Sequence, residues 1–565
     1  MPALAAALVV MLGGALRFEA LVTRYWEPQG APSWALHTRA VLTSLHPRSF
    51  TLAAQPKPYE GDPFSYLRFA RESRGFYDAH VREPLFLVAA RLGLRVSAGQ
   101  DIGLNFASAF FGTVLVLATL LLGARAASPW VGIAAAALLA IERRVVALSV
   151  EGWRDDTYAA FAILTAWALL GLLRRPSRQR ALLAGALGAA ACLTRLTSLV
   201  FLLPAWAFIA LWGQGGRQQR LRALGLCAGV TLVLVAPYLV NCAVAFGDPF
   251  YAVNYHAGDF SRRAGLSLGG PTGVAAFLAS LQGPFERFDT LWLGLTSVPF
   301  ESKWTGFRNW SPFLGPALAW TALVGLSSWA LRTEGRFFLV LLGGLLLPYA
   351  MIWEIPGGNN WRYTLPVYPF YLIGACALCG RIAWLAAHRS FTSLGKEALQ
   401  IGGVAAAGLL LANLLQYARV AEAVRRGRGA LVEAGPRDGL ILTDGWSWPE
   451  REGNIRLRHT QREAGLITLP MPGGTNLAVR LRLYVRGLSG RVAVYLDGAP
   501  LVTLDAPELP QIGNYRLVLP SSRLLEHRAC LRLEAAPGET ILLWYVRLEG
   551  LAPAAGADPA SAAEP

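Results

Sequence analysis

The chain contains 565 residues, of which 54% are hydrophobic and only 16% are charged, and its formal net charge is +16. This composition is too apolar for an ordinary soluble protein of this length and predicts a multi-pass helical membrane protein. The positive charge comes almost entirely from arginine and is scattered along the chain rather than gathered into tracts. That distribution argues against a nucleic-acid-binding protein.

Hydrophobic runs that could form spanning helices occupy most of the first 415 residues. A helix needs roughly 20 apolar residues to cross a bilayer, and about eleven runs approach this length. The first run lacks a basic start and a clear small-residue cleavage site, so it predicts a helix rather than a signal peptide. The runs begin near residues 3, 102, 129, 156, 181, 197, 222, 312, 337, 362 and 398.

Basic residues fall on alternate short connections between these runs, and such connections face the cytoplasm in membrane proteins. With the amino terminus inside, this pattern predicts that residues 17–101, 142–156 and 242–311, and everything after about 416, lie on the outer side. We therefore predict a membrane domain over residues 1–415 and expect the functional residues in its external segments.

The composition changes near residue 430 to alternating polar and apolar residues, broken by Gly, Pro and Asp. This pattern is typical of strands and turns and predicts an external β-sandwich of the jelly-roll kind over residues 430–550. The stretch VYLDGAPLVTL resembles a strand-turn-strand of jelly-roll carbohydrate-binding modules. The Ala- and Pro-rich tail, residues 551–565, is predicted to be disordered.

The first external segment contains YEGDPFSYLRFARE, with Glu60 and Asp62 on either side of a glycine. Asp62 followed by Pro63 is a common helix start, with the acid at the N-cap and proline at the first helical position. The same capped helix end would also hold a carboxylate rigidly. Helix capping and catalysis are therefore both open for Asp62.

The second external segment contains SVEGWRDDTYAAF, in which Glu151, Arg154, Asp155 and Asp156 fall close together at the start of a hydrophobic run. The aspartates could cap the helix and complement its dipole. Charged residues this dense at a membrane boundary also indicate a functional site, because burying them in lipid is costly.

Basic residues expected on the same side are Arg195 in CLTRLTSL and Arg362, followed by Tyr363, in NNWRYTLPVYPF. Each arginine could be an interfacial anchor. Guanidinium groups also bind phosphate, and carboxylates activate hydroxyl groups or hold divalent cations. The third external segment adds candidate contacts for substrate or phosphate, of which His256 has no partner at zinc-ligand spacing. These candidates are Tyr255, His256, Arg262 and Arg263.

In this order, the features resemble the GT-C class of membrane glycosyltransferases, which contains protein O-mannosyltransferases, bacterial aminoarabinose transferases and oligosaccharyltransferases. The resemblance extends over most of residues 1–415 and rests on EGDPFSYLRFAR, SVEGWRDD, LTRLT, FGDPFYAVNYH and RYTLPVYPF. It implies a donor sugar carried on a polyprenyl phosphate and transfer on the non-cytoplasmic face.

By this resemblance, Asp62 matches the first-loop catalytic acid, and Asp155 and Asp156 match the second-loop acids. Many mannosyltransferases carry adjacent Asp and Glu in the first loop, whereas this chain has Glu60-Gly61-Asp62, so either acid is a candidate base. The WWD-type acceptor motif of oligosaccharyltransferases is absent from the sequence. Its absence argues against transfer of a whole oligosaccharide to asparagine.

Displacing a polyprenyl phosphate from an anomeric carbon requires a base on the acceptor hydroxyl and positive charge on the departing phosphate. We expect Asp62 to be the base, with Glu60 as the alternative, and Arg154, Arg195 and Arg362 to bind phosphate, with Arg262 and Arg263 as further candidates. A single displacement would invert the anomeric configuration. The second-loop acids could hold Mg²⁺ or Mn²⁺ or orient sugar hydroxyls, and both roles remain open.

The rival hypotheses are a transporter or flippase of lipid-linked sugars and a non-catalytic membrane scaffold whose sandwich binds glycan. A transporter would not need so large a first external segment, and transporters often show paired broken helices related by a repeat. No such pair is evident in the sequence. The low lysine and high Ala, Arg and Gly content indicates a GC-rich bacterial genome, which predicts a protein of the inner membrane.

Overall fold

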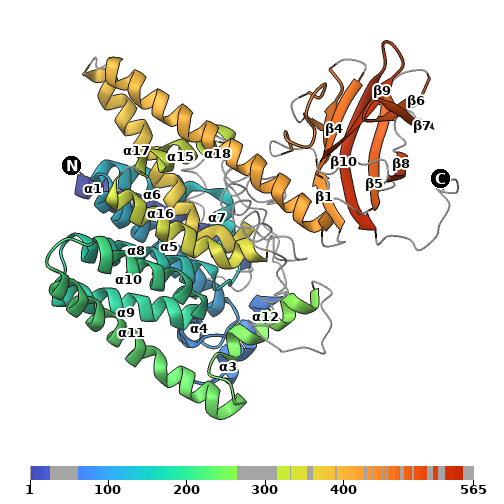
Figure 1. Ribbon diagram of the computed structural model, residues 1–565. Coiled ribbons are helices and arrows are strands. Elements are labelled where there is room, and N and C mark those ends of the chain that lie inside the picture. Colours follow the sequence, from blue (N-terminus) through green and yellow to red (C-terminus); the bar gives the residue numbers. More distant parts are fainter. Residues whose placement is uncertain are drawn as a thin grey trace. The chain divides into compact units, whose positions relative to one another are not determined.

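The computed structural model describes residues 2–25, 61–263, 315–330, 332–352, 361–388 and 391–425, and most of 429–551, with short breaks between strands (Figure 1). Glu60, the adjoining residues 26–59, residues 264–314 of the third external segment and the tail after Leu551 lie outside the described residues. The chain forms two compact units, and it passes from the first to the second between Gly402 and Gly403, within one long helix.

The first unit is helical, and helices lie at or close to all of the predicted starts. Its elements are α1 (Pro2–Tyr25), α3 (Asp62–Glu72), α4 (Pro84–Val96), α5 (Ile102–Ala126), α6 (Pro129–Ile141), α7 (Arg143–Ser149), α8 (Asp155–Arg174), α9 (Arg178–Thr194), η2 (Leu196–Ser198), α10 (Leu199–Trp212), α11 (Arg217–Phe246), α12 (Tyr251–Arg263), α15 (Gly315–Trp329), α16 (Thr333–Met351), η4 (Trp361–Val367), α17 (Tyr368–Ala387) and the first part of α18 (Phe391–Arg425).

Within the described ranges, five helical segments are long and apolar enough to cross a membrane, namely Pro2–Leu21, Ile102–Ala126, Asp155–Arg174, Arg217–Phe246 and Arg362–Ala387. The chain is therefore a multi-pass helical membrane protein. The helices α6 and α10 are apolar but shorter, so the full number of crossings stays a prediction. Of the five segments, the one in α8 is the most buried and the one in α11 the least.

The interior position of α8 follows from its neighbours, because α5 and α9 pack along it (Figure 1). Close packing elsewhere depends on glycine. Where α4 meets α5, a Cβ atom added to Gly93 would lie 2.1 Å from the backbone oxygen of Gly103. Only residues without a side chain allow the two backbones to approach so closely. The end of α4 is thereby held against the start of α5, which is long and apolar enough to span a membrane.

The second unit contains two antiparallel sheets. The larger has the order β2-β3-β10-β5-β8, with β1 also paired to β10, and the smaller has the order β4-β9-β6-β7. The strands are β1 (Gly429–Glu433), β2 (Glu450–Glu452), β3 (Ile455–His459), β4 (Ala464–Pro470), β5 (Asn476–Arg486), β6 (Arg491–Leu496), β7 (Ala499–Asp505), β8 (Gly513–Leu519), β9 (Arg528–Ala535) and β10 (Thr540–Leu551).

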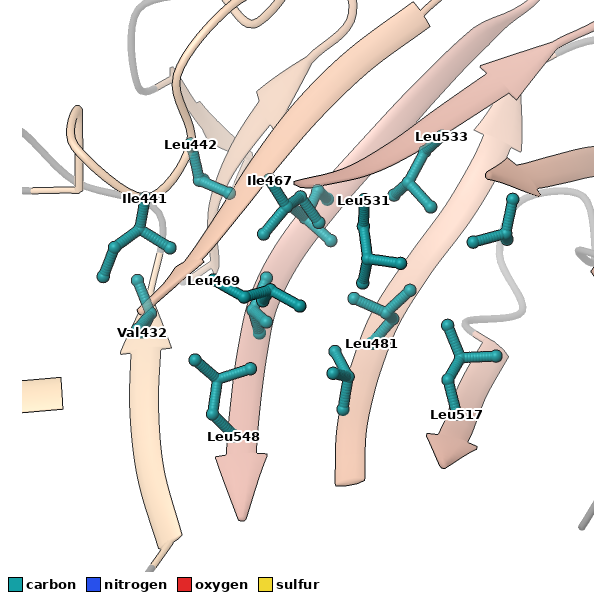
Figure 2. Close-up of a cluster of buried hydrophobic side chains, with 14 of the residues drawn as sticks. Val432, Ile441, Leu442, Ile467, Leu469, Leu481, Leu517, Leu531, Leu533 and Leu548 are labelled. Carbon is teal, nitrogen blue, oxygen red and sulfur yellow. The ribbon is translucent and has the colours of Figure 1, made fainter. Parts of the chain in front are cut away.

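A single hydrophobic core joins the two sheets. Figure 2 shows Leu481, Leu517 and Leu548 of the larger sheet gathered with Ile467 and Leu531 of the smaller one. Alternate residues of β4, β5, β6 and β9 face this core, as expected when one face of a sheet is buried. The predicted strand-turn-strand is the β6–β7 hairpin, with positive φ angles at Asp497 (49°) and Gly498 (86°). This turn is the type that two-residue hairpins favour.

Candidate active site

Asp62 is the first residue of α3, and its carboxylate faces two arginines. Arg82 Nη2 donates to Asp62 Oδ1 at 2.7 Å, and Arg362 Nη2 donates to Oδ2 at 3.5 Å. The expectation that Asp62 is the N-cap was wrong, because Gly61 occupies the cap with φ of 64° and no side chain caps the helix. A glycine adopts this backbone angle easily. The carboxylate is therefore available for contacts outside its own helix.

The charge state of Asp62 is set by two opposing effects. Burial alone would raise the pKa of its carboxyl group, but the positive charges of Arg82, Arg362 and Arg154 outweigh burial and hold the pKa below its usual value. The side chain keeps 31% of its surface exposed. Asp62 is thus an ionised carboxylate that a small molecule can reach.

Arg362 lies between Asp62 of α3 and Asp155 of α8. While Nη2 contacts Asp62, Nη1 lies 3.9 Å from Asp155 Oδ2. The guanidinium group is centred 3.8 Å from the ring of Trp153, a distance typical of a cation–π contact, and it also donates to the hydroxyl of Tyr363 at 3.3 Å. Four contacts fix one planar cation in place.

Asp155 has a second arginine partner. Its Oδ1 accepts a hydrogen bond from Arg195 Nη2, and both side chains are nearly buried. Arg195 also donates to the hydroxyl of Tyr349 at 3.1 Å. The rings of Tyr349 and Tyr363 stack with centroids 5.4 Å apart, and Arg195 lies within cation–π distance of both. Residues from α8, η4, α16 and the α9–η2 turn thus form one cluster of acids, arginines and phenols.

A buried ion pair that the sequence reasoning missed supports this cluster. Glu83 and Arg154 are hydrogen-bonded ion partners, with 4% and 6% of their side chains exposed. Glu83 Oε1 also accepts from Leu196 N at 2.9 Å, and Arg154 donates to the carbonyl of Thr194 at 3.3 Å. The pair therefore ties the start of α4, the start of α8 and the α9–η2 turn together. The signal was an adjacent Arg-Glu before Pro84, inside the first external segment.

The two aspartates at the start of α8 have different surroundings. Asp156 is fully buried and accepts from Ser149 Oγ at 2.9 Å. Ser149 Oγ in turn accepts from Arg17 Nε of α1 at 3.2 Å. Asp155, in contrast, faces the arginine cluster. Successive helix residues point about 100° apart, so adjacent acids rarely share a partner.

His256 of α12 contacts Arg82, which lies just before α4. Its Nε2 lies 2.8 Å from Arg82 Nη1, the same guanidinium that binds Asp62. Burial, together with the charges of Arg82 and Arg154, lowers the pKa of His256 to about 3. The ring is therefore neutral at physiological pH and can accept a hydrogen bond from Arg82 through Nε2.

The remaining predicted residues lie around the cluster or beyond the described part. Glu151 accepts from Trp153 Nε1 at 3.2 Å and is half-buried. Tyr255 is exposed, with its ring edge-on to His256. Arg262 and Arg263 end α12, but their side chains lie outside the described part of the chain, as does Glu60.

The predicted divalent cation does not fit Asp155 and Asp156 together, because one faces arginines and the other faces Ser149. No group of three or more His, Cys, Asp or Glu side chains suited to a metal ion occurs among the described residues. No step below is routed through a metal.

Residues 81–240 match the family model described as dolichyl-phosphate-mannose-protein mannosyltransferase. The match confirms the resemblance to polyprenyl-phosphate-dependent GT-C transferases, and it spans Arg82, Glu83, Asp155 and Arg195. No curated protein sequence matches the chain.

Several solved structures are similar to parts of the chain. The oligosaccharyltransferase of Archaeoglobus fulgidus in complex with zinc and sulfate is 14% identical, with 71% of this chain and 52% of that chain covered and a TM-score of 0.42. ArnT of Cupriavidus metallidurans bound to undecaprenyl phosphate is 16% identical, with 74% and 68% covered and a TM-score of 0.40. The C-terminal CBM6 of LamC from Zobellia galactanivorans is 14% identical, with 22% and 99% covered and a TM-score of 0.17. The chain spans about half the length of the oligosaccharyltransferase structures it matches.

Proposed function

We propose that the protein is a glycosyltransferase that moves a sugar from a polyprenyl-phosphate donor to an acceptor hydroxyl at the outer face of the membrane. The observation that carries the proposal is the position of Arg362, which contacts Asp62 at 3.5 Å and Asp155 at 3.9 Å. A reachable carboxylate and a cluster of arginines meet there. The family match over residues 81–240 supports the same reading.

Asp62 acts as the general base. Its lowered pKa keeps the carboxylate ionised at neutral pH, so it can accept the proton of an acceptor hydroxyl. The carboxylate is a weak base, but the hydroxyl proton becomes acidic as the new glycosidic bond forms, and transfer occurs late in the displacement. Attack from the face opposite the phosphate leaves the anomeric configuration inverted.

Arg362 and Arg195 stabilise the departing phosphate. In the structure both guanidinium groups are neutralised by carboxylates, so a bound phosphate competes with Asp62 and Asp155 for their N–H donors. The contact between Arg362 and Asp62 is longer than that between Arg82 and Asp62, so it is the easier one to exchange. Donor binding would thereby release one oxygen of the base.

The setting of this reaction is proposed from the sequence. The charge pattern of the short connections places the cluster and the C-terminal unit on the outer side, and the composition suggests a bacterial inner membrane. Within this proposal, residues 1–415 form the catalytic membrane domain and residues 430–550 an external sandwich. The rival transporter would bind the same donors but form no product.

Replacing Asp62 by Asn tests the proposal. Protein in nanodiscs is incubated with a panel of polyprenyl-phosphate sugars and acceptor alcohols, and products are identified by mass spectrometry. Loss of a general base should lower the transfer rate by about 10²- to 10⁴-fold while donor binding is kept. Asp101→Asn is the matched control, because Asp101 pairs with Arg71 in the same external segment and both are about half exposed. Transfer by Asp62→Asn at the wild-type rate would refute the assignment.

A further inference from the structure

Three arginines stand side by side on the larger sheet of the second unit. Arg480 of β5 is paired in register with Arg516 of β8 on one side and with Arg547 of β10 on the other. Residues directly opposite each other in antiparallel strands have Cβ atoms about 4.5–5.5 Å apart and project from the same face. The register therefore places three guanidinium groups in one row, which we call the arginine row.

The arginine row lies on the outer face of the sheet. The residues beside each arginine along its strand belong to the core, and Leu481, Leu517 and Leu548 point into it in Figure 2. Side chains alternate along a strand, so the arginines point the other way. About half of the side-chain surface of Arg480 (49%) and of Arg547 (50%) is exposed, and Arg516 is exposed as well.

The row carries more positive charge than its neighbours neutralise. Glu549 lies 2.9 Å from Arg547 and 3.6 Å from Arg480, so one carboxylate is shared between two arginines. Like charges directly opposite each other destabilise a sheet. Arg482 adds charge on the same face of β5, two residues beyond Arg480, with its guanidinium 3.9 Å from the ring of Trp544.

The smaller sheet is charged differently. On its strands Arg532 pairs with Glu534 at 3.0 Å and Arg491 pairs with Asp505 at 3.8 Å, so each of these two arginines has its own acid. The sharing of one carboxylate between two arginines is thus a feature of the larger sheet's outer face and is not found for these two arginines. Among all these arginines, the destabilising placement of like charges opposite each other is confined to the outer face of the larger sheet. This indicates that a bound partner compensates for the cost there.

We infer that the arginine row binds an acidic glycan, a sugar polymer with repeated carboxylate groups. Neighbouring strands lie about 4.7–4.9 Å apart and successive side chains on one face of a strand about 6.8 Å apart, so the row and Arg482 offer several closely spaced cations to the carboxylates of one polymer chain. The partly exposed ring of Trp544, beside Arg482, adds an aromatic surface to the same face. This inference is independent of the proposed transfer reaction.

A bilayer fits this surface less well than a polymer. Arg480 and Arg547 belong to the interior strands β5 and β10 of the sheet, and the side chains of both are half-buried. A thin chain can lie down among such side chains.

The test measures binding of fluorescent polygalacturonate, an acidic polymer, to the full-length protein in phosphatidylcholine nanodiscs. The double variant Arg480→Gln/Arg516→Gln breaks the row and leaves the pair of Arg547 and Glu549 intact. Its affinity should fall by about tenfold or more, and salt should weaken it less than the wild type. The matched control is Arg491→Gln/Arg532→Gln, which removes the same charge from the other sheet and should bind as the wild type does.

Thermal unfolding without polymer provides a second readout. Removing like charges should leave the row variant at least as stable as the wild type, so weak binding cannot be attributed to misfolding. Equal affinity of the wild type and the row variant, equal weakening in the control variant, or equal binding of the neutral polymer pullulan would overturn the inference. So would binding to phosphatidylglycerol vesicles without binding to polygalacturonate, because that result would assign the row to a lipid surface.

Discussion

The ion pair between Glu83 and Arg154 gives the sharpest prediction for the membrane unit. Glu83→Gln keeps the shape of the side chain and an oxygen that can still accept from Leu196 N, but it removes the charge that balances Arg154. Removing one partner of a buried pair typically costs 3–5 kcal/mol, because the other charge stays buried without compensation. Since the hydrogen bond survives, we expect about 3 kcal/mol of lost unfolding free energy.

The pH dependence of this loss follows from the pKa of Glu83. Burial would raise the pKa, but Arg154 and the N–H of Leu196 lower it below the ordinary value of 4.5. A lowered folded-state pKa means that the stabilisation is fully present above pH 4.5 and is lost as the pH falls through the folded-state value. The wild type and the variant should therefore differ most at neutral pH and converge in acid.

The assay is equilibrium unfolding in mixed micelles titrated with sodium dodecyl sulfate, followed by circular dichroism at several pH values. Glu83→Gln/Arg154→Met, which removes both charges and keeps the volume, should recover part of the lost stability. A difference between Glu83→Gln and the wild type below about 0.5 kcal/mol, or a double variant no more stable than the single one, would refute the account of the pair.

Three further predictions concern the cluster itself. Arg362→Lys keeps the charge but loses the planar contact with two acids, so kcat/KM should fall by about 10²-fold, measured with the transfer assay; near-wild-type activity would contradict the bridging role. Asp155→Asn should lower both the transfer rate and the unfolding midpoint, because Arg195 and Arg362 lose the carboxylate that they share, whereas Asp156→Asn should lower chiefly the unfolding midpoint; a loss of transfer in Asp156→Asn alone would show that the two acids were misassigned. His256 has a lowered pKa, so its contribution to stability is full above about pH 6.5 and is lost toward pH 3. In His256→Gln the unfolding free energy should therefore fall less between these pH values than in the wild type, and an unchanged pH dependence would contradict this assignment.

The helices of the first unit could be predicted because lipid requires long apolar runs, and such runs are visible in a single sequence. The runs near 129 and 197 gave helices of only 13 and 14 residues, α6 and α10, since tertiary packing rather than hydropathy decides where they end. The boundary between the units falls inside α18, where the sequence shows no break.

The site was harder to predict because its contacts join residues far apart in the chain. Arg362 meets Asp62 across 300 positions, and both were singled out from the type and place of their charges. Arg82 was missed, although it contacts both Asp62 and His256, because the adjacent Arg-Glu before Pro84 was not recognised as a signal. Asp156 was grouped with Asp155 through adjacency, which ignores the angle between successive helix residues.

The crossing of Gly93 and Gly103 has a consequence for the evolution of this protein. The α4 helix begins beside Glu83 and contacts α5 at Gly93 and Gly103, where there is no room for a side chain. A larger residue at either position would force the two helices apart. Substitution of either glycine would shift α4 relative to α5. Glu83, which precedes α4 and pairs with Arg154, would move with it, although no residue of the cluster itself had changed. If the proposed reaction is under selection, Gly93 should therefore be constrained as well, although it lies ten residues into α4 and outside the cluster.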